Sequence, residues 1–348
     1  IVIIIFAFRY HKEIIENRMI SLLWLLYTVI LSYSTWMNTQ SVTWVMSAFM
    51  LGMQYIILFC TFYGFVNKRN SEELIQILIM FFLVMLIAND ALLPIKSYNF
   101  SNPDEQYLLG NKFLVSYYHC LFGALIYTKY KKTLKKNIAI LFLCYAVLIA
   151  SIVHCTTGII VAITIISMVY LPGLVKKLTE CPIAFIALLI AENILIWGST
   201  ALFTNPFIVN IVTNVFHKST DMTGRAKLNA VTIDLAEKKP LWGYGHLTDV
   251  YRNMFGYGNA QNGLFHIVTQ AGIIGAIVYF GAIFVGLRKG DDSHDTYGLI
   301  MYVYAMLVGS AVEINLSSQF IIAIALIYAI NSGKVKKKKK TIRKVVIR

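Results

Sequence analysis

Long hydrophobic runs separated by short polar breaks make up most of this chain. After an opening run, Ile1–Phe8, that is too short to cross a bilayer, the runs contain about 16 to 26 residues, the length that a helix needs to span the hydrocarbon core. The pattern predicts an all-α, polytopic transmembrane helix bundle of about 10–11 spans, the first of them incomplete. The ten full spans are predicted at Met19–Trp36, Val42–Val66, Leu74–Ile95, Lys112–Thr128, Asn137–Val153, Thr156–Leu171, Pro182–Phe203, Asn262–Leu287, Thr296–Glu313 and Ser317–Asn331.

The composition agrees with a membrane protein, because 58% of the residues are hydrophobic and only 14% are charged, whereas soluble domains carry about a quarter. Of the 31 Lys and Arg residues, 23 lie on one side of the predicted spans and 8 on the other. By the positive-inside rule, the richer side and the C-terminus are cytoplasmic. The net charge of +14 therefore reflects topology, and we expect no nucleic-acid partner.

Four parts follow from this pattern. N-terminal transmembrane helices occupy 1–203, a long extracytoplasmic loop 204–261, C-terminal transmembrane helices 262–331 and a basic cytoplasmic tail 332–348. Long loops are uncommon unless they are functional. We therefore expect outward-facing chemistry in the loop 204–261.

The polar segment "TDMTGRAKLN" lies inside this loop and opens a predicted helix, Arg225–Lys238. Leu228, Val231 and Leu235 form an apolar stripe on that helix, which we expect to lie flat on the outer membrane surface. Pro240 ends the helix.

The N-terminus of this helix is a candidate anion site. Thr223 can cap the helix, with Gly224 beside it, so Arg225 stands where unpaired backbone N–H groups and the helix dipole favour an anion. A guanidinium at that point provides a fork suited to phosphate oxygens. A solvated arginine without a ligand explains the local pattern about as well.

A polar stripe descends from the loop into the next span. Asn262, His266 and Gln270 are spaced i, i+4 and i+8, which places them on one helix face. Such a stripe must face protein or a water-filled cavity. It can equally be an interhelical hydrogen-bond seam, because Gly272 and Ala276 form a small-xxx-small pair that favours close packing.

These motifs, in this order, carry a resemblance to a known family. "TGR", an amphipathic helix, "PLWGYG" and "NAQNGLFHIVTQAGIIG", together with the upstream "LLGNKFLVSYYHCLFGALIY", resemble the O-antigen ligase and Wzy-type polysaccharide polymerase family. The resemblance implies a metal-independent GT-C glycosyltransferase of the bacterial cytoplasmic membrane, without a cofactor. It also implies that an acceptor hydroxyl attacks an oligosaccharide linked to undecaprenyl diphosphate, and that the lipid diphosphate leaves. A chain-length regulator and a flippase of the same pathway are further candidate partners, beside the lipid bilayer.

Site residues follow from the resemblance and the local chemistry. Stabilising a departing diphosphate without a metal requires cationic, donor-rich groups. The catalytic candidates are Arg225, His266, Gln261 and Asn262, and the substrate-binding candidates are Thr223, Gly224, Lys227, His246, Arg252, Gln270 and Lys112.

Three departures from the family pattern bear on the reaction. Gln261 stands where members often have His, Gln270 where they often have Glu, and Thr156–Thr157 where they often have Ser-Arg. Glutamine cannot accept a proton near neutral pH, so a base would be His266, His246 or the substrate itself. The polymerase branch is therefore favoured over the ligase branch. A flippase for the same lipid-linked sugars and a membrane scaffold are the alternatives from other classes.

Other polar residues in the spans have simpler interpretations. We expect Asp90 and Glu313 to reach water near outer span ends, Glu192 to make a structural hydrogen bond, and His119 to be a helix-packing partner. The five cysteines show no zinc-binding spacing, so neither a metal site nor a disulfide framework is implied.

Overall fold

The computed structural model describes residues 2–95, 107–130, 136–198, 210, 214, 225–246, 250–255, 260–288 and 296–346. Within these residues the chain forms α-helices joined by short connections, which confirms the all-α prediction. Contacts divide the chain into two compact units. Unit 1 comprises Ile1–Leu58, Ile183–Val285 and Ser310–Leu316, and unit 2 comprises Phe59–Pro182, Gly286–Gly309 and Ser317–Arg348.

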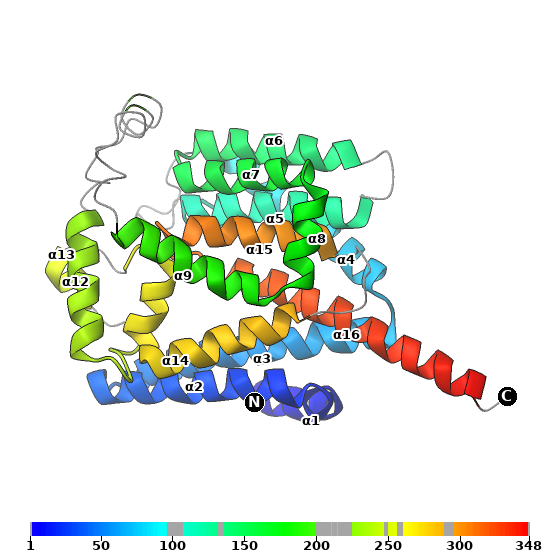
Figure 1. Ribbon diagram of the computed structural model, residues 1–348, viewed down its shortest axis with the longest axis horizontal. Helices are drawn as coiled ribbons and strands as arrows, with labels where there is room; N and C mark the ends of the chain where they lie inside the picture. The colour runs from blue at the N-terminus through cyan, green and yellow to red at the C-terminus, as the bar shows by residue number, and fades with distance from the viewer. Residues whose placement is uncertain are drawn as a thin grey trace. The chain divides into compact units, whose positions relative to one another are not determined.

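Unit 1 is built around a buried aromatic cluster. The Trp24 ring meets Tyr55 and Tyr279 edge to face, with centroids 4.8 Å and 5.4 Å apart, and Tyr27 lies beside Tyr279. Aromatic pairs prefer such edge-to-face geometry. The helices of this unit are α1 (Val2–Glu16), α2 (Arg18–Thr39), the first part of α3 (Val42–Lys68), α9 (Ile183–Gly198), α12 (Arg225–Lys238), α13 (Val250–Phe255) and α14 (Gly263–Leu287), as Figure 1 shows.

Unit 2 packs around α5 (Lys112–Tyr130), which is buried along most of its length. A Cβ added at Gly298 of α15 would lie 2.1 Å from the Ala124 carbonyl oxygen, so α15 approaches α5 at a glycine. Asn111 caps α5 by accepting from the backbone N–H groups of Phe113 and Leu114. The other helices are α4 (Ser71–Leu92), α6 (Lys136–Ile152), α7 (Thr156–Val169), α8 (Pro172–Glu180), α15 (Tyr297–Ser310) and α16 (Ser318–Val346).

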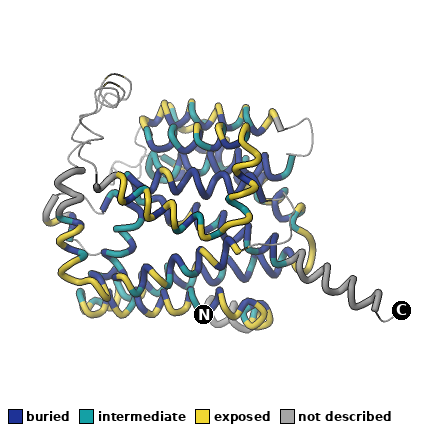
Figure 2. The backbone as a smooth tube through the Cα atoms, viewed as in Figure 1, coloured by how far each residue is buried: buried dark blue, intermediate teal, exposed yellow. Residues whose placement is uncertain are grey.

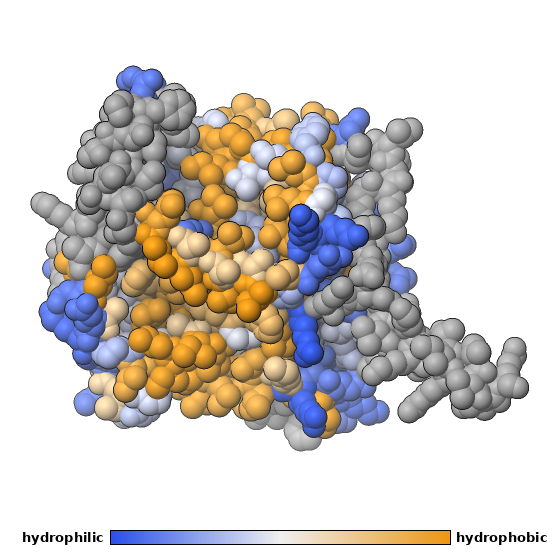
Figure 3. Space-filling view, viewed as in Figure 1, coloured by the Kyte–Doolittle hydropathy of each residue, from blue (hydrophilic) through white to orange (hydrophobic). Residues whose placement is uncertain are grey.

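Several helices are long and apolar enough to cross a membrane. Among the described residues, α2, α3, α4 and α14 meet this condition, and the pair α7 and α8, bent by 100°, is a possible fifth span. Shorter apolar segments lie in α6, α9, α15 and α16. Exposed positions recur along α2 and α9 (Figure 2), and hydrophobic side chains cover most of the face that carries α9 (Figure 3). The protein is therefore a multi-pass membrane protein, while the number of ten full spans stays a prediction.

Two local features differ from the sequence prediction. Lys176 and Lys177 were expected in a connection but lie in α8, which begins at Pro172, where the missing N–H costs nothing, and buries Val175. Glu313 was expected to reach water but is only 6% exposed. The Ile314 N–H donates to the Glu313 carboxylate, so this buried oxygen has a hydrogen-bond partner.

The expectation for Glu192 is confirmed. Its carboxylate accepts a 2.8 Å hydrogen bond from the Ser310 hydroxyl. Both residues belong to unit 1, and the bond joins α9 to the last residue of α15. Glu192 thus has a structural partner, as buried polar groups usually do.

Candidate functional site

The membrane helix α14 is interrupted at Gly272, where φ is 67° and ψ is −175°. An interruption leaves the preceding carbonyl groups without partners in their own helix. The loop after α12 supplies these partners, because the Tyr244 N–H donates to the Thr269 carbonyl at 2.7 Å and the Gly245 N–H to the Gln270 carbonyl at 2.8 Å. Irregular backbone at membrane depth is tolerated where protein satisfies it in this way.

The same loop also receives donors from beyond the interruption. The Ile273 N–H donates to the Pro240 carbonyl at 2.7 Å. A Cβ added at Gly272 would lie 2.0 Å from the Leu241 carbonyl oxygen. Gly272 thus serves close packing, as the sequence suggested, but its neighbour is the loop 240–245 rather than another helix.

Two glycines of the loop are required by its path. Gly243 and Gly245 have φ values of 69° and 89°, in the left-handed region that glycine adopts without strain. A Cβ at Gly243 would lie 2.5 Å from the Thr269 carbonyl oxygen, and one at Gly245 the same distance from the Thr35 Cα. Glycine is therefore needed for conformation and for space at both positions.

The end of α2 forms the other wall of this site. The Ser34 hydroxyl donates to the Gln270 carbonyl at 3.0 Å, the Thr35 hydroxyl accepts from the His246 N–H at 2.9 Å, and Asn38 donates to the Gly243 carbonyl at 3.2 Å. The sequence analysis missed these residues. Their signal was the hydroxyl- and amide-rich run "SYSTWMNTQS" at the end of an otherwise apolar helix.

The two histidines of the site lie near one another. His246 follows Gly245, whose N–H is hydrogen bonded to the Gln270 carbonyl, and His266 lies one helical turn before Gln270 on α14. Burial lowers the pKa of His246 below the usual 6.5, so its imidazole is neutral at pH 7. Its Nδ1 atom is buried and has no hydrogen-bond partner among the described residues. A neutral, buried imidazole nitrogen without a partner is suited to accept a proton.

Asn262 has a structural task at the start of α14. Its side-chain oxygen accepts from the Phe265 N–H at 2.9 Å, as an N-cap does. Its amide donates to the Asn193 side chain at 2.8 Å and to the Ala311 carbonyl at 3.1 Å. Asn262 is 1% exposed, whereas His266 and Gln270 on the same stripe are partly exposed. Asn262 therefore agrees with the hydrogen-bond-seam interpretation, whereas a water-filled cavity along His266 and Gln270 stays a prediction.

The long loop packs onto the beginning of α14. Leu235 of α12 and Tyr251 of α13 are buried together with Ala260, and Val231 packs against them. The Tyr251 hydroxyl is hydrogen bonded to the Thr269 hydroxyl at 2.8 Å. Helix α12 has the predicted bounds, and Val231 and Leu235 point into this cluster, which confirms that part of the apolar stripe.

The remaining candidates are less fully described. Thr223 and Gly224 lie outside the described residues, and for Arg225, Lys227 and Arg252 the structure gives the helical backbone but not the side chain. Arg225 is the first residue of α12, as predicted.

Three further residues, Gln261, Lys112 and Lys239, lie in different parts of the fold. Gln261 immediately precedes Asn262, the N-cap of α14, and its own φ is 46°. Lys112 begins α5 and belongs to unit 2, whereas the other described candidates belong to unit 1. Lys239, which the sequence analysis passed over, lies 4.8 Å above the Tyr244 ring and contacts Asn38. Among the described residues, no group of three or more His, Cys, Asp or Glu side chains is placed to hold a metal ion.

Comparison with known protein families matches residues 138–280 to the family described as O-antigen ligase. The matched segment begins in α6 and ends in α14, so it contains the loop 240–245, both histidines and the interruption at Gly272. No curated protein and no solved structure matches the chain. The family comprises glycosyltransferase-like ligases and polymerases that act on polysaccharide. Residues 138–280 are thus similar to the O-antigen ligase family, which supports the resemblance seen in the sequence motifs.

Proposed function

We propose that the protein polymerises undecaprenyl-diphosphate-linked oligosaccharide repeat units into a surface polysaccharide, such as a capsule, an exopolysaccharide or O-antigen. The reaction takes place at the outer face of the cytoplasmic membrane. The acceptor hydroxyl forms a bond to the anomeric carbon of the donor, the bond from that carbon to the diphosphate oxygen breaks, and the hydroxyl proton passes to a base.

The observation that carries this proposal is the interrupted helix with its inserted loop. The pairing of 240–245 with Thr269 and Gln270 brings His246 beside the polar stripe of α14, inside the segment that matches the family. A rigid backbone constellation of this kind holds reacting groups in place without a metal. His246, with its lowered pKa and its unpartnered Nδ1, is the base that this geometry favours.

The leaving diphosphate needs positive charge and N–H donors. Helix α12 begins at Arg225, so a basic residue stands in the first turn, where the backbone N–H groups have no partner within the helix. We assign the diphosphate to this end, with Lys227 and Arg252 as secondary cations. The packing of Leu235 and Tyr251 against Ala260 supports the assignment, because it anchors α12 and α13 to the start of α14.

The departures from the family pattern favour a polymerase over a ligase. Gln261 and Gln270 replace the ionisable residues that members often have at these positions, and neither can exchange a proton near neutral pH. The alternatives are transfer of finished polysaccharide to a final acceptor and, from another class, flipping of lipid-linked sugars.

Deletion of the gene in its host, followed by sizing of the surface polysaccharide on a gel, separates these functions. A polymerase mutant displays single repeat units without long chains. A ligase mutant still makes long chains but leaves them on the lipid carrier, and a flippase mutant displays no unit. Either of the last two results would contradict the proposal.

A further inference from the structure

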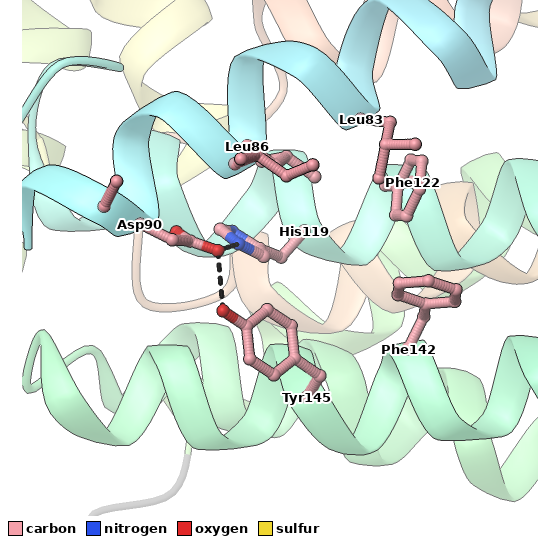
Figure 4. Close-up of a pocket in the computed structure, with 9 residues that line it drawn as sticks. Leu83, Leu86, Asp90, His119, Phe122, Phe142 and Tyr145 are labelled. Atoms are coloured by element: carbon pink, nitrogen blue, oxygen red, sulfur yellow. Dashed lines mark hydrogen bonds and ion pairs between the residues drawn. The ribbon is translucent and has the colours of Figure 1, made fainter.

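A second polar feature lies in unit 2, outside the segment 240–270. Helices α4, α5 and α6 enclose a cavity of about 510 Å³, within the roughly 300–1,000 Å³ that is typical of small-molecule sites. Figure 4 shows Asp90, His119 and Tyr145 converging at one end of it. The remainder of the lining is hydrophobic and includes Leu86, Phe122 and Phe142.

The polar end is a connected group of side chains. Asp90 Oδ2 lies 3.1 Å from His119 Nε2 and accepts a 2.8 Å hydrogen bond from the Tyr145 hydroxyl. Asp90 Oδ1 accepts from the Asn89 side chain at 3.1 Å. The His119 Nδ1 atom lies 2.8 Å from the Val115 carbonyl oxygen, which can only accept, so Nδ1 carries a proton. His119 was expected to pack helices, and it does so as part of this polar group.

The hydrogen bonds within this polar end determine what it can offer a ligand. The proton between His119 and Asp90 is engaged whichever of the two carries it, and the Tyr145 hydroxyl donates to Asp90. The Asp90 carboxyl group has about four hydrogen-bonding positions, and Asn89, His119 and Tyr145 occupy three of them, so one oxygen position remains as an acceptor. The Asp90 side chain is 16% exposed. The polar end therefore offers an acceptor to a ligand that brings its own donor.

The mouth of the cavity lies on a hydrophobic surface. Ile87 and Tyr145 line the cavity and are 61% and 38% exposed. Beside them, Val84 on α4 and Leu141 on α6 are 64% and 68% exposed. In a membrane protein, apolar side chains exposed in this way face lipid. A ligand thus reaches the cavity from the bilayer.

We propose that this cavity binds a long-chain alcohol dissolved in the membrane, with its chain along the apolar lining and its hydroxyl donating to Asp90. The shared chemistry is a neutral hydroxyl at the end of an apolar chain, whether the chain is alkyl or prenyl. An anionic headgroup fits poorly, because a phosphate would meet the Asp90 carboxylate and find the nearby donors already engaged. The site is independent of the proposed polymerase site.

Photo-crosslinking of the full chain in lipid nanodiscs tests this proposal. The probes are a diazirine-bearing hexadecanol and the hexadecyl phosphate with the same diazirine, and mass spectrometry measures labelling of the peptides of α4, α5 and α6. We expect about tenfold more labelling by the alcohol, the size that one hydrogen bond to a charged acceptor provides. Farnesol and hexadecanol, added unlabelled, compete with the probe and show whether prenyl or alkyl chains bind better.

Two pairs of variants sharpen the result. Ala91 lines the cavity and Ala88 does not, and both are exposed on α4, so Ala91→Trp fills the cavity and Ala88→Trp is its matched control. We expect labelling to fall about tenfold in the first variant only. Asp90→Asn removes the charge and should bring the alcohol-to-phosphate ratio towards one. Equal labelling by both probes in the unaltered protein, or equal losses in the two tryptophan variants, would overturn the proposal.

Discussion

The interrupted helix of unit 1 and the cavity of unit 2 place polar groups among membrane helices in two different ways. At α14, backbone N–H and carbonyl groups of the loop 240–245 pair with a broken helix, and glycines make the pairing possible. Between α4, α5 and α6, the backbone stays helical and side chains alone form the polar group. The pairing at α14 tolerates little change, because one methyl carbon added at Gly272 would overlap the loop 240–245. The polar group of unit 2 depends instead on the identity of its three side chains, Asp90, His119 and Tyr145.

The largest effect is expected from Gly272→Ala. The new Cβ would lie 2.0 Å from the Leu241 carbonyl oxygen, and the left-handed backbone adds about 1–2 kcal/mol. We expect loss of folded protein and of polymer, measured by thermal unfolding in detergent and by polysaccharide sizing. Gly281→Ala on the same helix is the matched control, because a Cβ there meets nothing within 4 Å. Equal behaviour of the two variants would show that the interruption is not essential.

Replacement of His246 is expected to affect the reaction more than the fold. Loss of a general base costs roughly 10²–10⁴-fold in rate. His246→Asn should therefore lower polymer formation by purified protein at least about a hundredfold while its unfolding temperature changes little. His154→Asn serves as the control, because His154 is an exposed histidine in unit 2 and asparagine tolerates its left-handed backbone. Normal turnover of the His246→Asn variant would show that His246 is not the base, and that His266 or the substrate accepts the proton.

Asn262 should behave as a structural residue. Asn262→Ala removes the N-cap of α14 and two further hydrogen bonds, so we expect a loss of about 1–2 kcal/mol in unfolding free energy. Asn262→Asp keeps the cap but turns a buried carboxylate oxygen towards the Asn193 and Ala311 oxygens, so it should be no more stable than Asn262→Ala. Activity for each folded molecule should stay within a few-fold. A large fall in turnover at unchanged stability would instead support the catalytic role that the sequence suggested.

The smallest effect concerns pH. The neutral imidazole of His246 is the proposed base, and its lowered pKa means that it protonates only below pH 6.5. The initial rate should therefore fall with decreasing pH, with the midpoint of the fall below pH 6.5. A midpoint at or above pH 6.5 would indicate a base with an ordinary or raised pKa.

Much of the architecture followed from the sequence, because hydrophobic length and charge are local properties. Helix α12 was predicted with its observed bounds from the spacing of Val231 and Leu235 and from Pro240. The span predicted from Lys112 begins where α5 begins, and Asn111 caps this helix.

The rest depended on partners that are distant in the chain. Gly272 looked like a helix-packing residue because its neighbour, Leu241, belongs to a loop thirty-one positions earlier whose path no periodicity reveals. The contact of Asp90 with His119 and Tyr145 joins three helices, and each residue alone had an ordinary explanation. Ser34 and Thr35 were overlooked for the same reason, since their role appears only where the loop reaches α2.

The central claim is that lipid diphosphate leaves from a site at the start of α12. The most direct test measures polymer formed by purified protein from lipid-linked repeat units, with a chelator present, for the unaltered protein, Arg225→Ala, Arg225→Lys and Lys227→Ala. Removing one preorganised donor costs roughly a hundredfold or more in rate, so Arg225→Ala should be nearly inactive. Arg225→Lys keeps the charge without the fork and should retain measurable activity, and Lys227→Ala should change little. Near-normal turnover of Arg225→Ala, with Lys227→Ala impaired, would contradict the account.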